Sequence, residues 1–159
     1  MHFWKRFEPQ ACSPSLRATE KEALLAELVT GLAGARALVG ELVPRALAAL
    51  VERERVASTG VGHGVAIPHV RVHGLAEAVA SLSIHRRGVE WGAVDGEPVQ
   101  IVFAVLRPYR RGDRHDPVAH LEFMRWVARV AHSSDFRRKA LAARSSEELV
   151  EHLRGMASC

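Results

Sequence analysis

The segment from Val99 to Leu106 is apolar at every position except Gln100. A strand of this kind carries apolar side chains on both of its faces, so both faces must be covered by other parts of the chain. Covering layers on each side of a strand are the mark of a layered domain. This segment therefore predicts a central strand, and the rest of the chain has to supply the layers that bury it.

Helical patterns precede this strand. Thr19 and Glu22 have the spacing of a capping box, which predicts a helix over about 20–33. A second helix is expected over about 41–54, where Pro44 is tolerated because it falls in or beside the first turn. The stripes that these helices bury should be formed by their apolar residues at helical spacing: Leu24, Leu25, Leu28, Val29, Leu32, Leu42, Val43, Ala46, Leu47, Leu50 and Val51.

The middle of the chain predicts strands. Val65–His69 is a short apolar strand that follows a glycine-rich loop. Residues 78–85 alternate between two classes of side chain, which is the two-residue period of a strand with one face more buried than the other. A polar loop over residues 107–117 follows the central strand and is expected to be exposed.

Helices are expected to close the chain. Apolar residues from Val118 to Val130 mark the first, Ser134 is a candidate cap for a short second, and Ser145 with Glu148 forms a capping box for a third. Helices before and after a group of strands give a single domain of the α/β class. Residues 1–15 lack periodicity and predict an N-terminal arm, so the domain itself should span residues 16–159.

Composition excludes several classes of protein. The chain has 159 residues, 48% of them hydrophobic, which suits one ordinary core. It lacks both the roughly 20 consecutive apolar residues of a membrane span and the features of a signal peptide, so we expect a cytoplasmic protein without membrane insertion. Its 22 basic residues are dispersed among 18 acidic ones, which argues against a nucleic-acid partner. Cys12 and Cys159 match no metal or disulfide spacing.

The residues that carry chemistry are concentrated between Ser58 and His69. Three glycines precede a short apolar strand, and His69 follows Pro68 directly. A neutral imidazole is a competent nitrogen nucleophile near neutral pH, and phosphoryl transfer needs mainly positioning and charge stabilisation. A histidine held beside main-chain N–H groups can therefore carry a phosphoryl group without a metal or cofactor. The glycine spacing is not that of a nucleotide-binding P-loop.

The segment Arg53–His69, which ends in Ala-Ile-Pro-His, closely resembles the active-site segment of enzyme IIA proteins of the fructose–mannitol type in the bacterial phosphotransferase system. A free-standing domain with this core is most similar to the nitrogen-regulatory branch. The resemblance implies a three-layer α/β/α sandwich with a central mixed sheet. It also implies that His69 accepts the phosphoryl group, that Arg53 stabilises it, and that His120 is the second histidine of the site.

The same resemblance implies the partners. A histidine phosphocarrier protein would donate the phosphoryl group to His69. Two outcomes then remain: a regulatory role, in which the phosphorylation state of His69 changes affinity for a target protein, or transfer to a IIB subunit for fructose- or mannitol-type sugar uptake. The free-standing chain, which has no fused transporter and no IIB-like cysteine motif, favours regulation.

Several residues of this segment have alternative interpretations. Ser58, Thr59, Gly60 and Gly64 are candidate phosphoryl-binding residues, but loop formation explains the first two equally well. His63 is more simply a loop residue.

A metal site made of His63, His69 and His73 is a minor alternative, because the helical ligand spacing is absent and Pro68 interrupts the run. Two departures from the family pattern also stand out. Val70 replaces a usually small residue and could narrow the approach of a donor, and the loop 107–117 is longer and more basic than expected.

Overall fold

The central strand expected from the sequence is β5 (Val99–Pro108), the middle strand of a five-stranded mixed sheet. The structure is a computed structural model that describes residues 2–109 and 117–158. β4 (Val79–Val89) runs antiparallel along one edge of β5. β2 (Val65–Ala66) and β3 (His69–Val72) pair in parallel with successive parts of the other edge.

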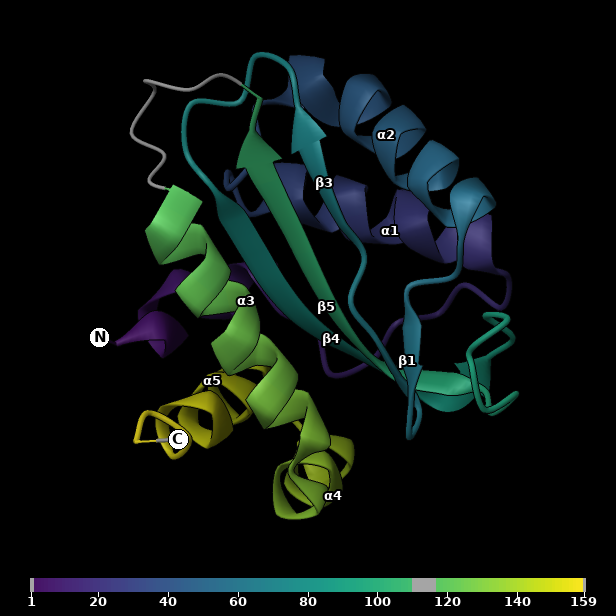
Figure 1. The fold of residues 1–159 in the computed structure, drawn as a ribbon, viewed down its shortest axis with the longest axis vertical. Coiled ribbons are helices and arrows are strands. Elements are labelled where there is room, and N and C mark those ends of the chain that lie inside the picture. The colour runs from purple at the N-terminus through teal and green to yellow at the C-terminus, as the bar shows by residue number, and fades with distance from the viewer. Residues whose placement is uncertain (1, 110–116, 159) are drawn as a thin grey trace.

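β1 (Gly60–Gly62) completes the sheet by pairing antiparallel with β2. Helices cover both faces of the sheet (Figure 1). The helices that precede the strands cover one face: α1 (Lys21–Gly34) and α2 (Val43–Val56). Those that follow the strands cover the other: α3 (Pro117–His132), α4 (Ser134–Ala142) and α5 (Ser146–Arg154). The predicted α/β class, three-layer sandwich and mixed sheet are thereby confirmed.

Three short 3-10 helices complete the secondary structure of the described residues: η1 (Phe3–Arg6), η2 (Pro9–Ala11) and η3 (Gly40–Leu42). No helix in this described part of the chain is both long and apolar enough to cross a membrane.

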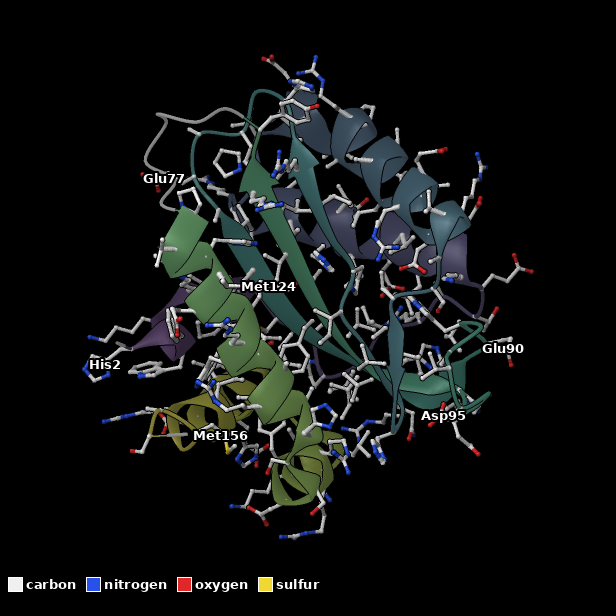
Figure 2. All side chains as sticks on the ribbon, in the orientation of Figure 1. His2, Glu77, Glu90, Asp95, Met124 and Met156 are labelled. Carbon is white, nitrogen blue, oxygen red and sulfur yellow. The ribbon has the colours of Figure 1, made fainter. Side chains whose placement is uncertain are left out.

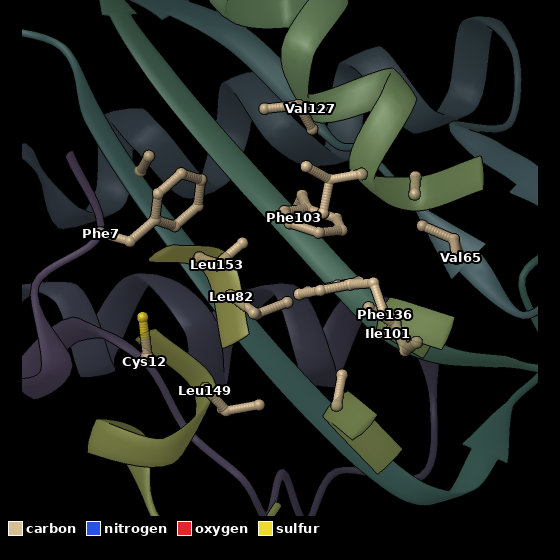
Figure 3. Close-up of a cluster of buried hydrophobic side chains, with 14 of the residues drawn as sticks. Phe7, Cys12, Val65, Leu82, Ile101, Phe103, Val127, Phe136, Leu149 and Leu153 are labelled. Atoms are coloured by element: carbon tan, nitrogen blue, oxygen red, sulfur yellow. The ribbon is translucent and has the colours of Figure 1, made fainter. Parts of the chain in front are cut away.

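Alternation along β5 divides the core into two clusters. One face, which we call the α3 face, carries Ile101, Phe103 and Val105 and packs against α3, α4 and α5 (Figure 3). The opposite face, the α2 face, carries Val102, Ala104 and Leu106 and packs against α1 and α2. All six side chains are at most 1% exposed. The two-sided burial predicted for this strand is therefore confirmed.

The expectation that residues 1–15 lie outside the core is wrong. Phe7 is 1% exposed and Cys12 is 5% exposed, and both belong to the cluster on the α3 face (Figure 3). Phe7 and Ser13 form isolated parallel bridges to β4, and the Ser13 N–H donates to the Leu82 carbonyl at 3.1 Å. Burial also raises the pKa of the Cys12 thiol to about 11. This segment thus covers the outer edge of β4, where it satisfies backbone groups that an edge strand would leave open.

The helix starts follow the sequence signals in part. Thr19 does not cap α1, because Glu20 is the N-cap residue and no side chain accepts a bond there. Ser133 rather than Ser134 caps α4, with its hydroxyl accepting from the Phe136 N–H. The third signal is confirmed: the Ser145 hydroxyl accepts from the Glu148 N–H at 3.1 Å.

The strand boundaries differ from those expected near the polar segments. Val65–His69 is not one strand, since β2 ends at Ala66 and β3 begins at His69. Pro68 lies between them and has no N–H to donate, although its carbonyl accepts from Val105. β5 continues through Arg107 to Pro108, so the first residues of the predicted loop belong to a strand, and residues 110–116 of that loop lie outside the described residues.

Candidate active site

His69 is the first residue of β3, where it pairs with Val105 of β5. In a parallel ladder, paired residues point to the same side of the sheet, so the His69 side chain lies on the α3 face. It is half-buried, and its Nδ1 lies 2.8 Å from the Ile67 carbonyl oxygen. A carbonyl oxygen only accepts hydrogen bonds, so Nδ1 carries a hydrogen, and in the neutral imidazole Nε2 then keeps its lone pair. The local backbone therefore selects the imidazole tautomer whose Nε2 is nucleophilic.

The glycine-rich segment forms a tight hairpin between β1 and β2. Gly62 pairs with Val65, which leaves a two-residue turn of His63 and Gly64. Both turn residues have positive φ, 55° and 74°, as a type I′ turn requires. The His63 N–H donates to Asp95 at 2.9 Å, and this bond lowers the pKa of the Asp95 carboxyl. Figure 2 shows Asp95 beside this hairpin. His63 is a loop residue, as its simpler interpretation predicted.

Gly60 is fixed by packing. A Cβ atom at this position would lie 2.7 Å from the Ala93 Cβ and 3.2 Å from Trp91 Cδ1. Its N–H donates to the Ser58 hydroxyl at 3.1 Å, and the Ser58 hydroxyl donates to the Trp91 carbonyl at 3.0 Å. The carbonyl of Gly64 accepts from two N–H groups at the start of β5, those of Gln100 and Ile101. These residues thus have structural roles, and their contact with a phosphoryl group stays a prediction.

A buried polar network, which no sequence pattern indicated, joins this segment to the end of α2. Glu54 has a side chain only 5% exposed and forms an ion pair with Lys21 of α1 at 2.7 Å. Its carboxylate also accepts from the N–H and the hydroxyl of Thr59. Thr59 in turn accepts from Trp91 Nε1 at 3.2 Å, while Lys21 donates to the Trp91 carbonyl at 2.7 Å. We call Lys21, Glu54, Thr59 and Trp91 the Glu54 network.

The Glu54 network changes the interpretation of two predicted site residues. Thr59 is 4% exposed and its hydroxyl is already bonded within the protein, so this hydroxyl is not available to a ligand in this structure. The sequence signal was misleading at Glu54, because the alternation Glu52-Arg-Glu-Arg55 is typical of a solvated helix face. Only the packing of α1 against α2 shows that one of these four charges is buried.

Arg53 precedes Glu54 in the last turn of α2. Its Nη1 donates to the Ala57 carbonyl at 2.6 Å, which closes the C-terminal end of the helix. Cations near a helix C-terminus also interact favourably with the helix dipole. Arg53 is half-buried, its bond to Ala57 lies at the surface, and the guanidinium has further N–H donors besides the one that this bond uses. Arg53 is therefore held at the surface beside the segment that leads to His69, and its contact with a phosphoryl group stays a prediction.

His120 is the fourth residue of α3, in the first turn of the helix, and is 8% exposed. The buried side of α3 also includes Phe123, Trp126 and Val127, which pack on the α3 face of the sheet. Figure 2 shows Met124 of the same helix turned toward the strands. His120 and His69 therefore both face the layer between α3 and the sheet, and their joint action in one site stays a prediction.

Val70 lies on the α2 face, packed against the cluster there, so its branched side chain points away from the side that carries His69.

The histidines of the metal alternative lie on different elements: His63 is in the hairpin turn and His73 stacks on Tyr109. Within the described part of the chain, no three His, Cys, Asp or Glu side chains gather as metal ligands would.

Comparisons with known proteins place this geometry in a family. Residues 7–155 match the family model described as "Phosphoenolpyruvate-dependent sugar phosphotransferase system, EIIA 2". The chain is 30% identical over 141 residues to the nitrogen regulatory protein of Bradyrhizobium diazoefficiens, covering 89% of this chain and 87% of that protein. It is 32% identical over 108 residues to the fructose-specific EIIA component of Haloferax volcanii, covering 68% and 67%.

A solved structure is similar over nearly the whole chain. The crystal structure of the nitrogen regulatory protein IIA-Ntr from Neisseria meningitidis superposes with a TM-score of 0.82 at 27% identity. The alignment covers 94% of this chain and 97% of that one. Fold and sequence thus point to the same group of proteins.

Proposed function

The chain belongs to the EIIA 2 family of the phosphoenolpyruvate-dependent sugar phosphotransferase system, and we propose that it is a regulatory phosphohistidine carrier whose phosphoryl acceptor is His69. The observation that carries the proposal is the bond from His69 Nδ1 to the Ile67 carbonyl at 2.8 Å. This bond fixes the ring and leaves the Nε2 lone pair available for attack on phosphorus.

The proposed reaction moves a phosphoryl group between two imidazoles. His69 Nε2 attacks the phosphorus of a phosphohistidine on a histidine phosphocarrier protein. A new N–P bond forms as the donor's N–P bond breaks, and the donor imidazole leaves with that electron pair. No metal or cofactor takes part, because positioning and charge stabilisation supply most of the catalysis in phosphoryl transfer.

Arg53 and His120 are proposed to stabilise the transferred group. The Arg53 guanidinium can offer two parallel N–H donors to phosphoryl oxygens, which a lysine cannot do. An N–H of His120 can stabilise charge on a third oxygen without carrying the group itself. These roles belong to rate and stability, whereas His69 determines whether phosphorylation occurs.

Regulation is proposed as the main output. Phosphorylation adds about two negative charges at His69, which is enough to change affinity for a target protein. The support is similarity to nitrogen regulatory proteins over most of the chain and to the IIA-Ntr structure. The alternative is transfer to a IIB subunit in sugar uptake, which the similarity to a fructose-specific EIIA component favours.

Intact-mass measurement tests the proposal. The chain is incubated with phosphoenolpyruvate, enzyme I and the histidine phosphocarrier protein of the same organism, and we expect one acid-labile phosphoryl group. A His69→Ala variant should fold and stay unlabelled. Stoichiometric labelling of that variant would contradict the proposal. Adding purified IIB subunits separates the two outputs, since loss of the label to IIB would favour sugar uptake over regulation.

A further inference from the structure

The register of β3 and β5 places two arginines on the same pair of strands as His69. His69 pairs with Val105, and two residues further along both strands Arg71 pairs with Arg107. Because side chains alternate along a strand, Arg71 and Arg107 lie on the same face of the sheet as His69. Strands rise about 3.3 Å per residue, so the arginine row follows the histidine row by roughly 7 Å.

The two arginines are an unbalanced pair of like charges. Arg71 is exposed and Arg107 is half-buried. No carboxylate among residues 2–109 and 117–158 forms an ion pair with either of them. Desolvation and then the charge of Arg71 lower the pKa of Arg107, which shows that each arginine lies in the field of the other. Like charges facing each other across a ladder destabilise a sheet, so folding does not explain this pair.

An aromatic pair follows the two arginines along the chain. His73 and Tyr109, two residues beyond the arginines, stack with ring centroids 3.6 Å apart and an interplanar angle of 25°. Tyr109 is 49% exposed. Tyrosine and arginine are enriched in protein–protein interfaces and among the residues that dominate binding energy. The arginine pair and the aromatic pair together thus have the residue types of a protein–protein interface as well as a positive charge.

We propose that Arg71, Arg107, His73 and Tyr109 form a docking surface for an acidic face of the phosphoryl donor protein. This inference rests on the proposed function, because it takes His69 as the acceptor at one end of the surface. The phosphoryl group arrives as a dianion on the donor, so the incoming face is negative where it meets this chain. Carboxylates around the donor's phosphohistidine would complete the match to the two arginines.

The dimensions fit such a contact. The arginines lie roughly 7 Å along the strands from His69 at about 3.3 Å per residue, and the aromatic pair lies two residues beyond them. An ordinary interface buries about 800 Å² on each partner, which is large enough to include all of these rows together with His69. One partner can therefore present its phosphohistidine to His69 while its neighbouring carboxylates contact the arginines.

The test measures phosphoryl transfer from the phosphorylated histidine phosphocarrier protein against salt concentration. We expect kcat/KM for the Arg71→Gln/Arg107→Gln variant to fall tenfold or more at low ionic strength, since charge steering contributes about 10- to 1000-fold to association rates. The rate at saturating donor should change less than kcat/KM. Salt should slow the unmodified protein strongly, and slow the double variant little, because surface charges are screened within about 10 Å at 0.1 M.

Matched variants separate docking from folding and from overall charge. Arg138→Gln/Arg144→Gln also removes two exposed positive charges, but around α4 at the opposite end of the molecule from the ends of β3 and β5 (Figure 1), and should transfer normally. Arg71→Lys/Arg107→Lys keeps the charges and should retain most of the salt dependence.

Two results would overturn the docking surface. One is an unchanged kcat/KM in the Arg71→Gln/Arg107→Gln variant with its circular dichroism spectrum intact. The other is an equal loss in the Arg138→Gln/Arg144→Gln control. Failure of the proposed function is distinguishable, because the unmodified protein would then acquire no label at all.

Discussion

Replacing Glu54 by alanine removes the central acceptor of the Glu54 network. The change would leave Lys21 without its ion-pair partner and would leave the buried hydroxyl and N–H of Thr59 without their acceptor. Breaking a buried ion pair by removing one partner costs about 3–5 kcal/mol. Lys21 keeps its bond to the Trp91 carbonyl and is 24% exposed, so we expect the lower part of that range, about 3 kcal/mol.

Thermal unfolding followed by circular dichroism measures this loss. For a domain of this size 1 kcal/mol corresponds to about 2–4 °C, so Tm should fall by about 6–12 °C. Glu22→Ala is the matched control, because Glu22 pairs with Arg55 at 3.5 Å with both side chains about two-thirds exposed. Surface pairs of this kind contribute about 0–1 kcal/mol. If the two variants lose the same stability, the Glu54 network does not hold the segment before His69.

Three further predictions concern single residues. Arg53→Lys keeps the charge but loses the paired donors, so labelling of His69 should slow about tenfold if about 1.4 kcal/mol of transition-state stabilisation is lost; equal rates in a quench-flow assay would make Arg53 a surface charge. His120→Ala should still reach one phosphoryl group per chain, but with slower acceptance or failed onward transfer, and unchanged kinetics in both steps would remove it from the site. Gly60→Ala forces a Cβ to within 2.7 Å of the Ala93 Cβ and should cost about 1–3 kcal/mol in denaturant unfolding, whereas Gly31→Ala, with open space around it, should not destabilise the protein.

Local patterns predicted the elements whose burial depends on their own sequence. β5 is apolar on both faces and is the central strand, and the stripe of α1 from Leu24 to Leu32 is buried as its spacing indicated. Ser145 caps α5 through a bond to an N–H only three residues away. In each case the deciding interaction lies within the element itself or follows from its pattern.

Contacts between distant parts of the chain account for the errors. Phe7 and Ser13 join the fold through β4, about 70 residues later, and no periodicity within residues 1–15 announces that pairing. α1 begins at Lys21, whose ammonium is bonded to Glu54 and to the Trp91 carbonyl, rather than at a Thr19 cap. The predicted cap is therefore wrong, whereas the helix predicted over about 20–33 is confirmed as Lys21–Gly34.

The candidate site likewise has features that local sequence predicts and features that depend on long-range contacts. His69 is recognisable as the candidate phosphoryl acceptor from Ala-Ile-Pro-His and the glycines before it, because these signals lie next to it in the sequence. The burial of Thr59 and the pairing of Arg71 with Arg107 depend on strand register and on the packing of α2, which the sequence does not show. The candidate acceptor could thus be chosen from the sequence, whereas the contacts that site residues make across the sheet could not.

The central claim is that the phosphoryl group is carried by Nε2 of His69, and NMR of the imidazole nitrogens tests it most directly. The chain is labelled with heavy nitrogen, phosphorylated by its phosphocarrier, and examined for phosphorus–nitrogen coupling. The bond from Nδ1 to the Ile67 carbonyl predicts coupling at Nε2 of His69, with the Nδ1 hydrogen retained. Coupling at Nδ1 of His69, or at any other histidine, would contradict the account.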